Sequence, residues 1–254
     1  MAIYSLRLTP IGKTTQKAPY TAAAHMSYIT RSGAASHVMS ARMPEGARAA
    51  LRWMRQQARE DRVNARVAAK LVIALPRELA LKDNIALVAE FAETLTRQRA
   101  PWIAAIHAKG KDRGNPHCHL LVRDRDPETG QRVVMFSAGP KEVRERASKG
   151  LSPPTTILRL RELWEEVANR ALARAGRNAR IDRRRLVGRG EYRLAQVHEG
   201  PNIRSMHARG VRPVSKEAAA RNRALRRKGT PATRIVRYQD IDGGMTRVEY
   251  NAYV

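Results

Sequence analysis

Three of the seven histidines in this 254-residue chain lie within one short stretch, where their spacing suits metal binding. His117 and His119 stand two residues apart in the segment GNPHCHLL (114–121), and His107 lies ten residues upstream of the pair. Alternate residues of a β-strand share one face, so His117 and His119 point the same way if this segment is a strand. Three imidazole ligands leave coordination positions of a divalent cation open, which is typical of a catalytic site.

The residues around these histidines predict the hairpin that would bring them together. The segment 101–108 (PWIAAIHA) reads as one strand, 117–124 (HCHLLVRD) as the next, and GKDRGNP as their turn. Because so short a connection makes the two strands antiparallel, His107 is expected to return beside the pair. Cys118 then points to the opposite face, into the core. The alternative is that all three are ordinary histidines of a solvated hairpin.

The rest of the chain predicts the elements that must position this hairpin. From their apolar patterns, further strands are expected at 2–9, 68–75 and 132–136. Helices are expected at 20–31, 45–66, 82–98 and 156–175. Gly176 is a natural stop for the last helix, and 139–154 reads as a loop. Together these elements predict an α+β fold, with helices packed on one side of a mainly antiparallel sheet.

The charge of the chain indicates what it acts on. Lys and Arg number 49 against 23 Asp and Glu, which gives a net charge of +26. The guanidinium group of arginine binds phosphate in a bidentate manner, so nucleic acid is the predicted partner. A cation held by three histidines would then polarise a phosphoryl oxygen of a phosphodiester. A membrane surface is a weaker candidate, because no stretch combines a basic helix with a bulky aromatic face.

Cysteine usage and hydropathy indicate the compartment. Cys118 is the only cysteine, which excludes an intrachain disulfide. The chain has no run of about 18 apolar residues, and its N-terminal MAIYSLRLTP alternates instead of forming a signal-peptide core. We therefore expect a cytoplasmic protein that does not insert into a membrane.

Several motifs, taken in order, resemble those of a known family. GNPHCHLL with the upstream IHAKG, the N-terminal MAIYSL and ALPREL (74–79) are similar to the MobA/MobL-type plasmid mobilisation relaxases, which are MOBQ-like members of the HUH endonuclease class. So are the helix RELWEEVANRALARAG (161–176), the ARID after it, and RLAQVHEGPN (193–202). The resemblance covers about residues 1–210. It implies an HUH relaxase fold with a palm or ferredoxin-like core.

The resemblance also implies an activity and a nucleophile. In this family a tyrosine near the N-terminus nicks one DNA strand at a plasmid origin of transfer, forms a 5′-phosphotyrosyl intermediate, and later rejoins the strand. The segment AAAHMSYITRSG fits the family pattern with Tyr28, and Tyr20 is the competing position at the helix start. The divalent metal, Mg²⁺ or Mn²⁺, is implied to bind at His107, His117 and His119.

One departure from the family concerns the proton acceptor for Tyr28. Members often carry acidic residues on the strand before ALP, where this chain has Lys70 and Val72. Glu78 of ALPREL is retained and joins Tyr28 as a catalytic candidate. A metal-bound hydroxide, Asp182 and bulk water are the other possible acceptors, which the sequence does not rank. The departure keeps open a DNA-binding protein of this fold with weak cleavage, and an unrelated His-metal phosphodiesterase is the third reading.

Arginine-rich stretches predict the surface that holds DNA. The candidate DNA-binding residues are Arg31, Arg180, Arg183, Arg184, Arg185 and Arg193. Trp53, Trp102 and Tyr192 could stack on unpaired bases, whereas Trp164 has the spacing of a core residue. The expected partners are single-stranded and partly duplex DNA at the origin of transfer, accessory mobilisation proteins and a coupling protein. The protein could also be transferred with the DNA.

The domain organisation is predicted from where the motifs end. Residues 1–210 are expected to form the relaxase domain. Residues 211–254 are expected to be a basic extension, with a short helix at 215–227 and a weak hairpin around Gly243.

Overall fold

The computed structural model describes residues 4–13, 21–134, 136, 140–150, 156–184, 186–192, 205 and 208–210. The strands are β1 (Leu6–Gly12), β2 (His37–Ala41), β3 (Arg66–Ala74), β4 (Trp102–His107) and β5 (His117–Val122). The α-helices are α1 (Ala22–Ile29), α2 (Ala47–Glu60), α3 (Leu81–Thr96), α4 (Pro140–Ser148) and α5 (Thr156–Arg174). Two 3₁₀ turns, η1 (Gly110–Asp112) and η2 (Val187–Arg189), complete the described elements.

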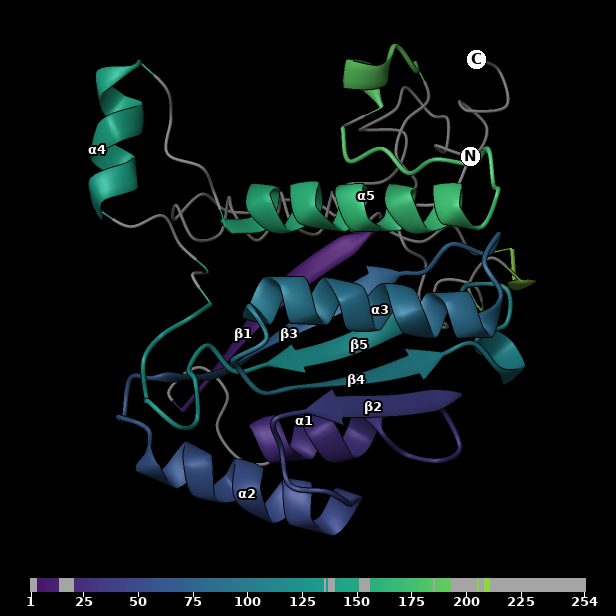
Figure 1. Ribbon diagram of the computed structural model, residues 1–254. Coiled ribbons are helices and arrows are strands. Elements are labelled where there is room, and N and C mark those ends of the chain that lie inside the picture. Colours follow the sequence, from purple (N-terminus) through teal and green to yellow (C-terminus); the bar gives the residue numbers. More distant parts are fainter. Residues whose placement is uncertain are drawn as a thin grey trace. The chain divides into compact units, whose positions relative to one another are not determined.

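The five strands form one antiparallel sheet in the order β1-β3-β5-β4-β2 (Figure 1). The predicted α+β class and the predicted hairpin between β4 and β5 are thereby confirmed. β5 is the middle strand, so both of its neighbours support it by backbone hydrogen bonds. The histidine-bearing strand is therefore held more firmly than a strand at the edge would be.

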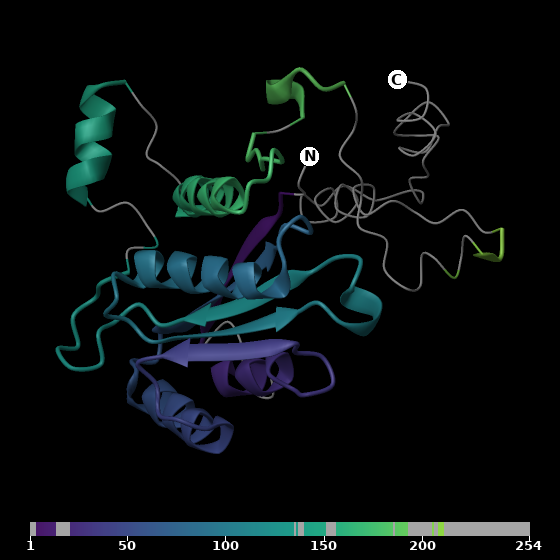
Figure 2. The ribbon, with the colours of Figure 1, turned by 45° about the vertical axis from the view of Figure 1, so that its right-hand side comes forward.

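Helices cover both faces of the sheet, so the expectation of helices on one side was wrong (Figures 1 and 2). On one face, α3 and α5 pack over the sheet, with the rings of Phe91 and Trp164 in edge contact at 5.2 Å between centroids. On the other face, α1 and α2 pack on the sheet through residues such as Met26 and Met54. α1 and α2 each have an apolar side, and the second face of the sheet is the surface that buries it.

The ends of α1 and α5 follow from local chemistry. Thr21 precedes α1, and its Oγ1 accepts a hydrogen bond from the backbone N–H of Ala24. Gly176 follows α5 with φ +66°, which an L-residue adopts only with strain, and so ends the helix as predicted. The N–H of Arg177 closes this end by donating to the carbonyl of Leu172.

The structure departs from the predicted elements in several places, each with a physical cause. The helix expected at 45–66 ends at Glu60, because the Arg123 guanidinium binds both the Asp61 carboxylate and the Val67 carbonyl and so fixes a bend. The strand expected at 132–136 is absent from the described residues of that segment. There the N–H groups of Val133 and Val134 both donate to the Asp124 carbonyl, so no ladder propagates.

Two elements were not predicted at all. β2 was missed because its residues are short and mixed in polarity, and it is recognisable only by its pairing with β4. α4 lies in the segment 139–154 that was expected to be a loop, so that expectation was wrong for its helical part.

The chain divides into two units, residues 1–183 and 184–254, and few residues of the second are described. The predicted domain boundary at residue 210 stays a prediction. The helix expected at 215–227 and the hairpin around Gly243 lie outside the described residues. In the described ranges, every helix is too short or too polar to cross a lipid bilayer.

Candidate metal centre and the tyrosine beside it

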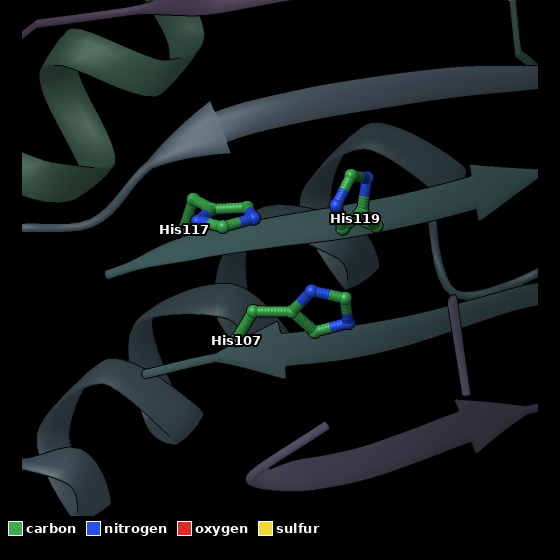
Figure 3. Close-up of side chains that lie close together, drawn as sticks. All are labelled: His107, His117 and His119. Atoms are coloured by element: carbon green, nitrogen blue, oxygen red, sulfur yellow. The ribbon is translucent and has the colours of Figure 1, made fainter. Parts of the chain in front are cut away.

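The three histidines meet on the face of the sheet that α1 and α2 cover. His107 and His117 are direct partners in the β4–β5 ladder, and His119 lies two residues further along β5. Their ring centroids are 4.7–5.2 Å apart, and one nitrogen of each lies within 4.8 Å of the others (Figure 3). The predicted convergence of the three imidazoles is confirmed. Cys118 is fully buried on the opposite face, as expected.

Backbone carbonyls set the orientation of two of the rings. His107 Nε2 lies 2.8 Å from the Ile29 carbonyl, and His117 Nδ1 lies 2.9 Å from the Asn115 carbonyl. A carbonyl only accepts, so these nitrogens each carry a proton, and the other nitrogen of each ring is the one turned to a metal. Such hydrogen bonds behind a ligand are the usual support of a metal-binding histidine.

Burial keeps two of the rings unprotonated. His107 is buried, and this burial lowers its pKa, against the opposing effect of its bond to Ile29. Burial also lowers the pKa of His119 to about 3, helped by the nearby rings of His107 and His117. A metal binds neutral imidazole, so neither residue has to lose a proton at neutral pH before it can act as a ligand.

The donor set fits a divalent cation. The described residues of the cluster supply three imidazole nitrogens, and His119 Nδ1 is a buried polar atom without a hydrogen-bond partner. A buried polar atom of this kind costs free energy unless something binds it, and a metal ion would do so. Three ligands would leave further coordination positions for water or a phosphoryl oxygen.

Tyr28 lies near the C-terminal end of α1, the end that contacts the histidine cluster. Its neighbour Ile29 gives its carbonyl to His107, so the ring of one candidate ligand anchors the helix turn that carries the phenol. Tyr28 is 62% exposed, which is unusual for a large aromatic residue and leaves the phenol open to a substrate. The guanidinium of Arg31 lies 3.9 Å from the centroid of its ring and also donates to its carbonyl. Tyr20 lies outside the described residues.

The two residues that depart from the family pattern lie on the same face as the histidines. Val72 is the direct ladder partner of His119, which explains why His119 Nδ1 finds no acceptor on the neighbouring strand. Lys70 is half-buried, and its Nζ lies 3.5 Å from Nδ1 of His25, three residues before Tyr28 on α1. Burial lowers the pKa of Lys70, as does the charge of Arg7, while an electrostatic interaction with Tyr28 raises it.

The structure does not bring the candidate proton acceptors to Tyr28. Glu78 lies in the turn between β3 and α3 with a buried, unbonded Oε2. In the part of the chain that is described, no hydrogen bond or ion pair joins it to Tyr28. Asp182 follows Ile181, which packs in the core on the α3 and α5 side of the sheet, away from the histidines.

The predicted DNA-binding arginines have varied surroundings. Arg31 lies beside Tyr28, as described above. Arg180 is exposed but turns back onto the carbonyls of its own loop, and Arg183 forms ion pairs with Glu162 and Glu165. Arg184 donates to the Gly188 carbonyl. Arg185 and Arg193 lie outside the described residues.

The aromatic residues that were candidates for stacking on bases differ in their exposure. Trp102 is buried and its indole N–H donates to Glu93, so it is not available for stacking on a base. Tyr192 is 81% exposed and Trp53 half-buried, which leaves both as candidates. Trp164 is fully buried, as its spacing predicted.

Solved structures and known proteins resemble this chain in both fold and sequence. A chain solved for the molecular basis of vancomycin resistance transfer in Staphylococcus aureus superposes with a TM-score of 0.52 at 21% identity, covering 72% of this chain and 100% of that one. At that level of identity the likeness shows a shared fold.

The sequence relatives show the family. Mobilization protein A of Escherichia coli is 36% identical over 227 residues, which cover 84% of this chain and 31% of that protein. The probable mobilization protein MobA of Bifidobacterium longum is 29% identical over 284 residues, which cover 92% of this chain and 49% of that protein. The chain thus spans less than half of the length of either relative. Residues 14–209 match the model of the MobA/MobL family, and the chain belongs to that family.

Proposed function

We propose that this chain is a DNA relaxase domain, which nicks one strand at a plasmid origin of transfer through Tyr28 and later rejoins it. The observation that carries the proposal is the hydrogen bond from His107 to the Ile29 carbonyl. It ties a three-histidine cluster to the turn that presents an exposed tyrosine, in a chain whose relatives are named for mobilization.

The reaction is a transesterification at phosphorus. The Tyr28 oxygen forms a bond to the scissile phosphorus as the bond from phosphorus to the 3′ oxygen breaks. The phenol proton leaves to an acceptor, and the departing 3′ oxygen takes up a proton. The product is a 5′-phosphotyrosyl link and a free 3′-hydroxyl, and reversal reseals the strand. A water nucleophile would instead make the cut irreversible.

The chain's own residues would orient the attack and balance its charge. His107, His117 and His119 would hold Mg²⁺ or Mn²⁺, which supplies a positive charge beside the phosphoryl oxygens. Arg31 holds the ring of Tyr28 from one side. Lys70 lies on the histidine side of α1 and interacts with Tyr28 electrostatically, so it favours negative charge on the phenol oxygen.

The partners and location follow as part of the same proposal. Single-stranded and partly duplex DNA at the origin of transfer is the proposed substrate, with accessory mobilisation proteins and a coupling protein as further partners. The protein would act in the bacterial cytoplasm. Because Tyr28 is exposed and no described bond joins it to Glu78, the proposed acceptor of the phenol proton is bulk water in place of Glu78.

The test is an assay for a covalent adduct. Overlapping single-stranded oligonucleotides that tile the DNA around the gene are incubated with the protein and Mg²⁺ or Mn²⁺, and then denatured. A labelled oligonucleotide that stays on the protein in denaturant supports the relaxase. Cleavage without an adduct favours a phosphodiesterase, and tight binding without cleavage favours a DNA-binding protein that has lost activity.

Lys70→Met should slow adduct formation at neutral pH by about three- to tenfold, because the phenolate loses a nearby positive charge. The measurement is the single-turnover rate of adduct formation between pH 6 and about 9.5.

Lys70→Arg is the matched variant, because it keeps the charge and should keep most of the rate. Metal affinity, measured by titration calorimetry, should not weaken in Lys70→Met, because Lys70 is not a metal ligand. The charge of Lys70 lowers the pKa of His119, and the variant removes only that effect. An unchanged rate at neutral pH would show that Lys70 has no electrostatic role in the reaction.

A further inference from the structure

A groove runs between α1 and α2 on the outer side of these helices. It consists of two adjoining hollows of about 490 and 640 Å³. The two hollows share three wall residues and so form one continuous feature, here called the α1–α2 groove. The shared residues are Thr21, Ala23 and Arg55.

The α1–α2 groove leads from a cluster of cations to Tyr28. One end is lined by Lys13 and Arg59, and the other by Tyr28 and Arg31. Lys13 is held in place there, because its ammonium donates to the carbonyl of Arg59 at 3.0 Å. An anion that enters at the Lys13 end and follows the groove therefore arrives at the exposed phenol.

Among the described residues, the arginines of α2 have no partner of opposite charge. Arg48, Arg52, Arg55 and Arg59 follow one another at spacings of four, three and four residues, so they form one stripe along the helix, and all four are exposed. In the described part of the chain, none of their side chains takes part in an ion pair or a hydrogen bond. The acid at the end of the helix, Glu60, is bonded instead by Gln56 and Gln57.

The arginines of α5 provide a contrast. Arg170 and Arg174 both bind the carboxylate of Glu90, and Arg183 binds Glu162. Their charge is already compensated, so a phosphate would have to compete with a carboxylate. The arginines of α2 face no such competition, and their like charges repel one another until an anion binds between them.

The remaining walls of the α1–α2 groove suit a polyanionic backbone. Ala23, Ala24 and Ser27 are small, so a chain can approach α1 closely. The first turn of α1 carries no acidic residue, and its N–H groups add a partial positive charge at that end. The charge of the groove and the position of Tyr28 at one end both fit a strand whose phosphates repeat along the groove.

We infer that the α1–α2 groove holds the phosphodiester backbone of the single DNA strand next to the phosphate that Tyr28 attacks. Arg55 and Arg59 each contact a phosphate. The inference rests on the proposed function for the identity of the strand, but the contacts themselves can be measured in the absence of cleavage.

The test is the salt dependence of binding to a 20-nucleotide oligo(dT), measured by fluorescence anisotropy without metal. Each lost phosphate contact lowers the slope of log K against log salt by about 0.7 for a single strand. The double variant Arg55→Gln/Arg59→Gln should therefore lower the slope by about 1.4 and weaken binding near 0.1 M salt by about 10- to 30-fold.

The control is Lys82→Gln/Arg177→Gln, which also removes two positive charges. Lys82 is exposed on α3, and Arg177 is exposed just after the end of α5. It should change affinity by less than about twofold, because distant charges are screened at this salt concentration. Equal thermal unfolding midpoints would confirm that both variants are folded. The inference is wrong if the Arg55/Arg59 variant matches this control in slope and affinity.

A second measurement connects the α1–α2 groove to the reaction. With an oligonucleotide that forms the adduct, the Arg55/Arg59 variant should need about 10- to 30-fold more DNA for half-maximal rate, and should reach the wild-type rate at saturation. A lower saturating rate with unchanged half-saturation would refute the groove as a binding surface. If the wild type forms no adduct while the slope still falls, the relaxase proposal fails and the groove stands.

Discussion

Tyr28→Phe should abolish the covalent adduct between the protein and single-stranded DNA, a loss of at least about a thousandfold in rate. The change removes only the nucleophilic oxygen. The ring remains, so the guanidinium of Arg31 keeps its partner, and the bond from His107 to the Ile29 carbonyl is untouched. DNA affinity should stay within about twofold of the wild type, because it rests on the cations.

The matched control is Tyr20→Phe, the same change at the competing tyrosine eight residues earlier. It should leave the adduct intact. The thermal unfolding midpoint of Tyr28→Phe should agree with that of the wild type, because Tyr28 is an exposed residue. An adduct that survives Tyr28→Phe and is lost in Tyr20→Phe would assign the chemistry to the other residue.

His117→Ala and His119→Ala should each prevent nicking and weaken metal binding by about a hundredfold or more, since each removes a ligand. These two positions are cleaner tests than His107, which also anchors α1 through the Ile29 carbonyl. Titration calorimetry with Mn²⁺ measures the metal binding, and the adduct assay measures the nicking. Oligonucleotide affinity in metal-free buffer should not change, and should still fall steeply with added salt.

His37→Ala is the control for a lost imidazole, because His37 lies on β2 as the ladder partner of Ile106 and outside the cluster. It should keep both metal affinity and nicking. Wild-type Mn²⁺ affinity in His119→Ala would mean that the three rings do not form the metal site.

The candidate site was predictable where the chemistry is local in the sequence. A two-residue spacing on a strand, a short turn and a third histidine define one face of one hairpin, and β4 and β5 place His107 opposite His117. The same alternation placed Cys118 in the core, where it is fully buried. These inferences needed only the geometry of a strand.

What the sequence could not provide depends on contacts between distant segments. The apolar side of α2 indicates that a surface covers it, but not that this surface is the second face of the sheet. The bend after Glu60 comes from Arg123, which lies 62 residues from Asp61. β2 forms a strand because it pairs with β4 through backbone hydrogen bonds.

The arginines illustrate the same limit at a functional site. Arg183 was singled out from a basic run, yet Glu162 and Glu165, which lie 21 and 18 residues earlier in the sequence, form ion pairs with it and neutralise it. The arginines of α2 are no richer in charge, but they lack such partners in the described structure. Which cations are available for DNA is therefore decided by pairing, and pairing is visible only once the chain is folded.

The most direct test of the central claim is to locate the DNA on the protein. Trypsin cuts after Lys17 and Arg31, so residues 18–31 form one peptide that carries both Tyr20 and Tyr28. After nuclease digestion of the adduct, tandem mass spectrometry of this peptide should place the residual phosphonucleotide on Tyr28. A phosphonucleotide on Tyr20, or an adduct in a different peptide, would contradict the account.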